Sequence, residues 1–425
     1  MTHYGIITLP ESGHLNPMMS LGYELKQRGH RVTVFTFLDA QSKVLAAGLE
    51  FQPVAASDFP LGSMKEISTK LGKLSGLKAL KYTIQRIKKS VEVNLRDLPL
   101  LLKKEGVEAL IIDQVTPEGG TVAEFLDIPF VSCACALMFN REISVPPLNT
   151  SWNYSSTAWA NIRNWMGYQL LTRITQPITE IINQQRLTWN LPLHSSPNDR
   201  YSQLAQLCQQ PAEFEFPRQH LPAHFHFCGS LANPASRAVT SFPFEKLTGQ
   251  PLIYASMGTI QNRLLEVFQI IAEACMDLDA QLVISLGGAA TPESLPNLAG
   301  SPLVVEYAPQ LELLKKTRLT ITHAGMNTTM ECLMNGVPMV AIPVANDQPG
   351  VASRIAWSGC GESIPLKKLS VAKLKTAIQK VLTEDSYKQN AVRLQEAIQR
   401  AGGVSRAADI IEQAIVTGKP VLAEK

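Results

Sequence analysis

One segment in the last third of the chain carries residues that are suited to holding an anion. A β-branched run at residues 318–322 is followed by the turn HAGMN at residues 323–327 and a helical stretch at residues 328–335. A strand that passes through a glycine-containing turn into a helix exposes backbone N–H groups at the positive end of that helix. We expect Gly325 to let an anionic ligand approach this backbone. The side chains expected to donate to the same anion are His323, Asn327 and Thr328.

The same helix start also has a purely structural interpretation. Thr328-x-x-Glu331 has the spacing of a capping box, and Asn327 is a suitable N-cap residue. Capping and anion binding therefore explain this segment equally well when it is considered alone.

A second pair of residues, His14 and Asp113, could act as a general base with its orienting partner. We expect strands at residues 4–9 and 107–113, so that His14 follows the first strand and Asp113 ends another. The carboxyl ends of parallel strands open on one edge of a sheet, so these side chains can meet although they are 99 positions apart. A carboxylate that orients a histidine beside a hydroxyl is the base-activation arrangement of hydrolytic triads.

The first helix is expected to begin close to His14, with Asn16 as its cap and Pro17 at its first position. The positive end of a helix lowers the pKa of an imidazole, so we expect His14 to be neutral at physiological pH, as a base must be. A loop histidine taken alone is more often a surface or capping residue. The presence of Asp113 at the same sheet edge favours the catalytic interpretation.

Two series of alternating strands and helices must position these residues. A chain of 425 residues is longer than one core usually serves, which predicts two domains. The expected strands are residues 4–9, 31–37, 49–54, 107–113 and 128–136 in the first series, and 252–255, 281–286, 303–306 and 318–322 in the second. The alternation predicts an α/β fold with two doubly wound parallel sheets that face each other across a ligand cleft.

The expected N-terminal domain covers residues 1–235 and the C-terminal domain residues 236–402, followed by a terminal helix within residues 403–425. Residues 144–240 have a looser pattern, with several short helical stretches and four of the five tryptophans. Such an aromatic insertion is typical of a substrate-pocket wall, and helix packing explains it equally well.

Composition limits the classes of partner. There are 39 basic and 36 acidic residues, a balance that gives no reason to expect nucleic acid. Residues 64–105 are the exception, with eleven Lys or Arg against four acidic residues. Seven irregularly spaced cysteines, no basic leader and no apolar run of membrane-spanning length predict a soluble, cytoplasmic protein. Cys133 and Cys135 share one face of a predicted strand, which favours burial over metal binding.

Several well-known motifs are absent from the sequence. There is no G-x-x-x-x-G-K-[ST] loop, no G-x-G-x-x-G after the first strand, no H-E-x-x-H and no G-x-S-x-G. Kinase-like, NAD-dependent and zinc-hydrolase functions are therefore disfavoured.

Three separate motifs together resemble the family 1 UDP-glycosyltransferases over nearly the whole chain. They are GHLNP at residues 13–17, YAPQ at residues 307–310, and HAGMNTTME at residues 323–331 followed by Asp347-Gln348. The resemblance implies two facing Rossmann-like domains (the GT-B arrangement), with the last helix crossing back to the first domain. It also implies a UDP-sugar donor as co-substrate, a small-molecule acceptor, and no metal or other cofactor.

The resemblance assigns roles to the donor-binding residues. Tyr307 would lie against the uracil, with Ala308 and Gln310 in the same motif, and Glu331 would accept from the ribose hydroxyls. The diphosphate would be held by His323, Gly325, Asn327 and Thr328, together with Gly258 and Thr259 after the first strand of the second domain. The sugar hydroxyls would be bound by Asp347 and Gln348.

The reaction implied by the resemblance is direct displacement at the anomeric carbon with inversion. His14 would take the acceptor proton and Asp113 would steady it. Asp347-Gln348 is compatible with glucose, which is the expected sugar. Tyr307 and Met326 stand where plant members usually have tryptophan, and these departures leave other hexoses open. The basic residues 64–105 and the aromatic insertion suggest a lipophilic acceptor that is approached from an anionic membrane surface, as in bacterial carotenoid glucosyltransferases of this family. The alternative for the basic segment is an ordinary helix face exposed to solvent.

Two other functions stay open at this point. A UDP-sugar epimerase or hydrolase could use the same two-domain architecture, although it gives no reason for His14 and Asp113 on the acceptor side. A non-catalytic module that binds nucleotide sugars is the third alternative.

Overall fold

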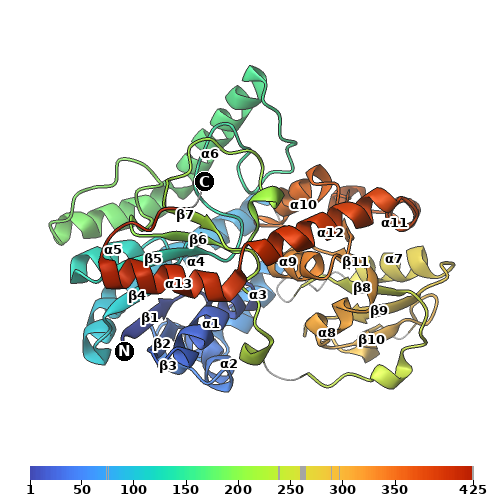
Figure 1. Ribbon diagram of the computed structural model, residues 1–425, viewed down its shortest axis with the longest axis horizontal. Coiled ribbons are helices and arrows are strands. Elements are labelled where there is room, and N and C mark those ends of the chain that lie inside the picture. Colours follow the sequence, from blue (N-terminus) through green and yellow to red (C-terminus); the bar gives the residue numbers. More distant parts are fainter. Residues whose placement is uncertain are drawn as a thin grey trace.

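The computed structural model describes residues 1–72, 74, 76–237, 240–258, 265–288, 290–295 and 297–423. Within these residues the chain forms two α/β domains that lie side by side (Figure 1). The first has a parallel seven-stranded sheet in the order β3-β2-β1-β4-β5-β6-β7. Its strands are β1 His3–Ile7, β2 Arg31–Thr36, β3 Glu50–Pro53, β4 Ala109–Asp113, β5 Phe130–Ala134, β6 Gln206–Cys208 and β7 Phe225–Phe227.

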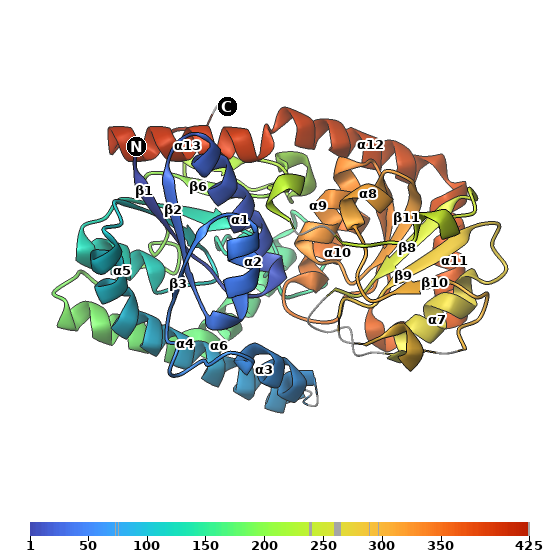
Figure 2. The same cartoon turned by 90° about the horizontal axis from the view of Figure 1, so that it is seen from below.

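Helices cover both faces of the first sheet, as Figure 2 shows from below. They are α1 Ser12–Gln27, α2 Gln41–Ala46, α3 Ser63–Gly72, α4 Gly76–Glu105, α5 Gly119–Leu126, α6 Ala158–Thr188 and, from the end of the chain, α13 Gly403–Thr417. Helices α1 and α13 bury their apolar side chains on one face, and α4, α5 and α6 do so on the other. Strands β1 and β4 are buried along their whole length, because helices cover both faces of the sheet, and their sequences are therefore mainly apolar.

The second domain repeats this plan with a parallel six-stranded sheet among the described residues, in the order β10-β9-β8-β11-β12-β13. Its strands are β8 Leu252–Ser256, β9 Gln281–Ser285, β10 Leu303–Val305, β11 Thr317–Thr322, β12 Met339–Ala341 and β13 Gly361–Ser363. Its helices are α7 Leu265–Cys275, α8 Gln310–Leu314, α9 Met326–Met334, α10 Gln348–Trp357, α11 Val371–Thr383 and α12 Asp385–Arg400. Both predicted doubly wound sheets are confirmed.

The end of the chain returns to the first domain. Helix α12 belongs to the second domain, and α13 continues from it across the boundary to pack against α1 (Figure 1). Arg28 at the end of α1 bonds to Asp409 and Glu412 of α13, both at 2.6 Å. The two domains are thus joined by the linker and by this returning helix.

A buried ion pair also joins the domains. Glu215, from the segment after β6, receives a bidentate contact from Arg354 of α10, and both side chains are 2% exposed. Burial alone would raise the pKa of Glu215, but Arg354 and Arg218 outweigh it and lower the pKa. The guanidinium of Arg354 also lies 4.3 Å from the ring centre of Phe216.

Helix α1 differs from the prediction. It begins at Ser12, so Pro17 is inside the helix and Asn16 does not cap it. Proline lacks the N–H that would bond to the carbonyl of Gly13, four residues earlier. That carbonyl instead accepts from Asn327 Nδ2 of the second domain, at 3.1 Å. A contact between the domains therefore satisfies the group that Pro17 leaves free.

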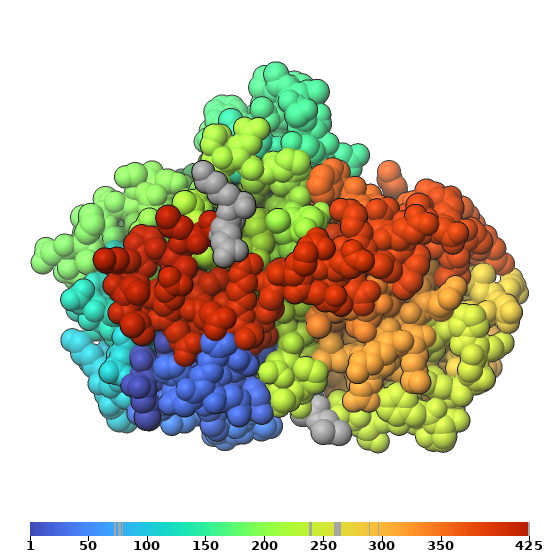
Figure 3. Space-filling view, in the orientation of Figure 1, coloured from blue at the N-terminus to red at the C-terminus, as the bar shows by residue number. Residues whose placement is uncertain are grey.

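The insertion after β5 also differs from the prediction. The expected short helices are one helix of 31 residues, α6, which passes through Pro177 without ending, and two short strands, β6 and β7, extend the sheet. The first turns of α6 project from the body of the molecule (Figure 3). No helix of the described residues is long and apolar enough to cross a membrane. All seven cysteines, each in the described part of the chain, are buried free thiols.

Candidate functional site

The predicted site residues lie where the strand order of each sheet reverses, a place that we call the switch point of that sheet. In the first sheet the chain moves outward in opposite directions from β1 and β4, and His14 follows β1 while Asp113 ends β4. In the second sheet β8 and β11 have the same relation, and Gly258 and His323 follow them. Loops diverge at such a point and leave a crevice, which is where open α/β sheets bind ligands.

The structure brings His14 and Asp113 into contact. His14 Nδ1 lies 2.9 Å from Asp113 Oδ2, and the carboxylate is fully buried while the imidazole is 19% exposed. Asp113 also accepts from Thr8 Oγ1 at 3.0 Å and from the backbone N–H of Val115 at 3.3 Å. These donors fix the carboxylate, and its bond to Nδ1 sets the tautomer that leaves Nε2 to exchange a proton.

The expected lowering of the His14 pKa is wrong. Burial does act to lower it, but Asp113, Glu11 and Asp347 together raise the pKa of His14 to about 9. The carboxylates come from three separate segments, so their combined effect was not visible in the local sequence. His14 is therefore mainly protonated at neutral pH in the free protein, stabilised by its bond to Asp113.

The turn after β11 is tightly built around His323. Gly258, at φ 78°, and Gly325 both lie against this ring, and a Cβ at either glycine would come within 2.5 Å of His323 Nε2. Ala324, between His323 and Gly325 in the chain, has φ 64°, a left-handed conformation that costs energy in a non-glycine residue. Burial lowers the pKa of His323 to about 4, and its buried Nδ1 has no hydrogen-bond partner.

The start of α9 does not have the side-chain cap that the sequence suggested as an alternative to anion binding. The N-cap is Gly325, which makes no side-chain cap, and Asn327 and Thr328 lie inside the first turn. The predicted capping box is therefore wrong, because the helix begins two residues earlier than expected. The first backbone N–H groups of α9 are left for another acceptor, as an anion site requires.

Asn327 links the two domains instead of capping. Its amide nitrogen lies 3.1 Å from the carbonyl of Gly13 and 3.4 Å from that of Ser12, at the start of α1. Its oxygen accepts from Gln209 Nε2 at 2.8 Å, and Gln209 also bonds to the carbonyl of Cys135. Gln209, just after β6, was missed because the strand before it was not predicted.

The motif at residues 307–310 lies beside α9, with Gln310 in contact with Thr328 and Glu331. Tyr307 is 51% exposed, and its hydroxyl lies so close to Gly288 that a side chain there would clash with it. Gln310 Nε2 donates to Glu331 Oε2 at 2.6 Å, and Gln310 Oε1 accepts from Tyr254. Ala308 packs against the buried cluster beneath.

Glu331 has a second partner that the sequence did not indicate. Arg237, in the linker between the domains, forms an ion pair with Glu331 Oε1, while the carboxylate is 2% exposed. A lone arginine in a linker carries no motif, so only the structure reveals this contact. It occupies one oxygen of the carboxylate that was expected to accept from ribose.

Asp347 and Gln348 lie at the start of α10, after Asn346 at φ 56°. Asp347 Oδ2 accepts from the backbone N–H of Leu137 in the first domain at 3.2 Å, and burial raises the pKa of the Asp347 carboxyl. Gln348 Oε1 accepts from the N–H groups of Val344 and Ala345 and so closes its own loop. Thr259 lies outside the described residues.

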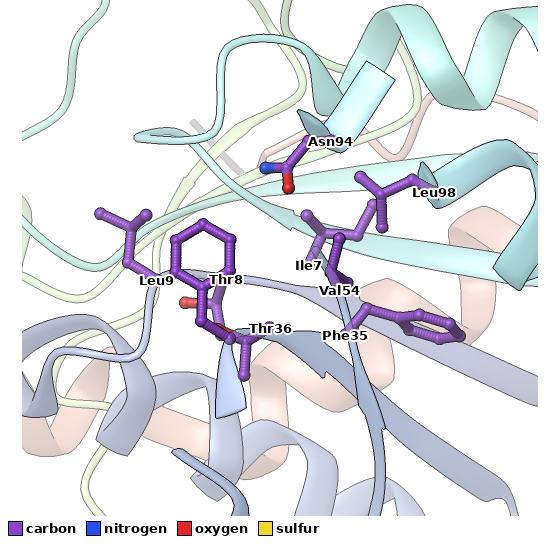
Figure 4. A pocket seen from close by; sticks show the side chains of 9 residues that line it. Ile7, Thr8, Leu9, Phe35, Thr36, Val54, Asn94 and Leu98 are labelled. Carbon is purple, nitrogen blue, oxygen red and sulfur yellow. The ribbon is translucent and has the colours of Figure 1, made fainter. Parts of the chain in front are cut away.

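A small cavity adjoins the pair formed by His14 and Asp113, which we call the dyad, in the first domain (Figure 4). It has room for about one water molecule, and Thr8, which bonds to Asp113, is in its wall. The remaining wall is mainly apolar, formed by Ile7, Leu9, Phe35, Phe37, Val54 and Leu98, with Thr36 and Asn94 as its other polar members. The described residues contain no group of three or more His, Cys, Asp or Glu side chains placed to hold a metal ion.

Known proteins share both the sequence and the fold of this chain. Residues 11–400 match the family model described as UDP-glucoronosyl and UDP-glucosyl transferase. A protein of Pantoea ananas named zeaxanthin glucosyltransferase is 34% identical, over 99% of this chain and 98% of its own length. A protein of the same name from Pseudescherichia vulneris is 31% identical, over 99% and 100%.

Solved structures agree on the architecture. The calicheamicin glycosyltransferase CalG4 superimposes with a TM-score of 0.73 at 20% identity, covering 99% of this chain and all of its own. The glycosyltransferase VinC, solved with DTDP, gives 0.71 at 18% identity, covering 98% and 100%. At this identity the structures show the shared fold alone, and the sequence matches show the family. The chain belongs to the UDP-glucoronosyl and UDP-glucosyl transferase family and is a glycosyltransferase that moves a sugar from a nucleotide sugar to a small acceptor.

Proposed function

We propose that the protein transfers a hexosyl group, glucose, from UDP-glucose to a hydroxyl of a small lipophilic acceptor, with inversion and with His14 as the general base. The observation that carries the proposal is the 2.9 Å contact between His14 and the buried Asp113 at the switch point of the first sheet. An imidazole held in one tautomer by a carboxylate is suited to accepting a proton from a hydroxyl.

The donor would lie along the second domain. Tyr307 offers an exposed ring for the uracil, and Glu331 would accept from the ribose hydroxyls once Arg237 releases its oxygen. The uncapped start of α9, with His323 and Thr328, would hold the diphosphate. Gly258 would approach the same phosphates, and Thr259 stays a predicted contact. Two relatives with glucosyltransferase in their names support glucose as the sugar.

The sugar end of the donor would be held near the base. The charge of Asp347 contributes to raising the pKa of His14, which supports this carboxylate as the group that binds the sugar near the base. Asp347 would accept from sugar hydroxyls, with Gln348 supporting the loop that carries it. Asn327 would close the two domains around the substrates through its contacts with the start of α1.

In the proposed reaction the acceptor hydroxyl gives its proton to Nε2 of His14 as its oxygen attacks the anomeric carbon. A new carbon–oxygen bond forms on one face of the sugar while the bond to UDP breaks on the other, so the configuration inverts. Asp113 stabilises the imidazolium that forms, and the positive end of α9 stabilises the negative charge on the leaving UDP. No metal is needed in this scheme, and independence from metal stays a prediction.

The two relatives named zeaxanthin glucosyltransferase support a lipophilic acceptor. Contact of the basic residues 64–105 with an anionic membrane, and a cytoplasmic location, stay predictions. Part of that charge is already neutralised, because Lys89 and Arg96 both bond to Asp58.

Replacing the base tests its assignment directly. We expect His14→Ala to lower turnover by roughly 10²-fold or more while leaving UDP affinity nearly unchanged, since the base acts on the acceptor. The measurement is UDP release and glycoside mass with UDP-glucose and a panel of lipophilic and phenolic alcohols. Loss of UDP binding in His14→Ala would contradict the assignment.

The same assay on the wild type separates the alternative functions. UDP release without an acceptor would indicate a hydrolase, and a new nucleotide sugar without UDP release would indicate an epimerase. Donor binding without any reaction would indicate a non-catalytic module.

The pH profile tests the raised pKa of His14. Only the neutral imidazole can accept a proton, and with a pKa of about 9 it is neutral in about 1% of free molecules at neutral pH. We therefore expect kcat/KM to rise with pH until about pH 9. Asp113→Asn removes the charge that raises this pKa, so the midpoint should move to lower pH and the plateau should fall. A midpoint that is the same in both proteins would contradict the coupling.

A pair of glycines tests the donor loop. Gly258 and Gly249 both have positive φ, 78° and 85°, but a Cβ at Gly258 would strike His323, whereas a Cβ at Gly249 meets nothing within 4 Å. Both alanine variants carry the same backbone strain, so their difference isolates the contact with His323. We expect Gly258→Ala to weaken UDP binding by about tenfold or more in calorimetry, and Gly249→Ala to leave it nearly unchanged. Equal affinities would contradict a phosphate site at this loop.

A further inference from the structure

The first half of α6 exposes a set of large apolar side chains. Their exposed fractions are 68% for Trp159, 51% for Ile162, 52% for Trp165, 47% for Met166 and 60% for Leu170. The spacing of three, three, one and four residues places all five on one face of the helix. We call this face the α6 tip.

Packing within the protein accounts for the other tryptophans of this region but not for those of the α6 tip. Trp152 lies under the guanidinium of Arg163 at 4.9 Å and against Gly167. Trp189, at the far end of α6, stacks on Phe125 at 4.0 Å. Trp159 and Trp165 are instead more than half exposed. Exposed apolar side chains that lie next to each other are uncommon on the surface of a monomeric protein and often mark a contact site.

The α6 tip is convex. The start of α6 and the segment before it rise above both domains in Figures 1 and 3, at the end of the chain segment that leaves the sheet after β5. Leu137, near the base of that segment, bonds to Asp347, and the carbonyl of Leu148 lies against Gly350 at the start of α10. The projection therefore stands next to the boundary between the domains.

The chain segment that carries the α6 tip has charges of one sign only. Residues 143–179 contain no Asp or Glu and two arginines, Arg163 and Arg173. Arg173 is exposed on α6, where its stem can lie along apolar surface with the guanidinium in a polar layer, whereas Arg163 lies over Trp152 and donates to the carbonyl of Asn153. A surface with exposed tryptophans and without acidic groups is complementary to an anionic, partly apolar partner.

We propose that the α6 tip docks into the interfacial layer of an anionic lipid bilayer. Tryptophan rings concentrate at the headgroup level of membranes, and arginines beside them interact with anionic headgroups. A convex aromatic tip can enter such a layer, whereas protein interfaces bury extended patches that fit a partner. The contact lies on α6 and does not require the basic residues 64–105, although α4 packs alongside α6 and its lysines would add attraction.

The test is sedimentation with vesicles of phosphatidylcholine, alone or mixed with phosphatidylglycerol. We expect the wild type to bind the anionic vesicles, and the variant Trp159→Ser/Trp165→Ser/Leu170→Ser to lose at least about tenfold in apparent affinity. Leu187→Ser is the matched control, because Leu187 is 59% exposed on the same helix but outside the tip. Thermal unfolding checks that the variants fold, and Trp165→Ser alone serves if the triple variant does not.

A second readout separates insertion from surface attraction. Lipids brominated on their chains should quench the tryptophan fluorescence of the wild type and of Leu187→Ser, but much less that of the tip variants. Charge reversal of the exposed Lys78 and Lys81 on α4 should reduce anionic binding without abolishing quenching.

Three outcomes would overturn the proposal. One is a wild type that binds neither vesicle, and another is a tip variant that binds as well as the wild type. The third is a wild-type dimer in solution that the tip substitutions dissociate, because the tip would then be an interface between two copies of the chain.

Discussion

The arrangement of the site depends on the buried ion pair between Glu215 and Arg354. It joins the first domain to α10 where water is excluded, and removing either partner would leave a buried charge uncompensated. Asp347 stands just before α10, so the pair that docks this helix also brings Asp347 to Leu137 and within electrostatic reach of His14. The pair therefore helps to hold residues of the two domains in the positions from which they would act on one substrate.

The two switch points have complementary electrostatic character. In the first domain the carboxylates of Asp113 and Asp347 raise the proton affinity of His14, so the neutral form of this imidazole is a strong proton acceptor. In the second domain burial keeps His323 neutral, and the uncapped start of α9 presents backbone N–H groups. A proton acceptor facing a stabiliser of negative charge is the combination required to join a hydroxyl to a sugar and release a diphosphate.

Parallel-sheet geometry made much of this predictable from sequence. The pairing of His14 with Asp113 followed from the rule that strand ends share one edge, although the residues are 99 positions apart. The sequence left a cap and an anion site as alternatives at the start of α9 because both use the same residue types. Pro17 was misplaced because Asn327 satisfies the carbonyl that Pro17 leaves free. Arg237, Gln209 and the sign of the His14 pKa shift depend on contacts between distant segments, which no local pattern records.

In the proposed reaction an acceptor oxygen, activated by His14, attacks the anomeric carbon directly in a single displacement. The stereochemistry of the first product tests this most directly. With UDP-α-glucose as donor, the proton NMR spectrum of the product, recorded before any anomeric equilibration, should show the β-glucoside. An α-glucoside would mean retention, and would contradict both the single displacement and the assignment of His14 as its base.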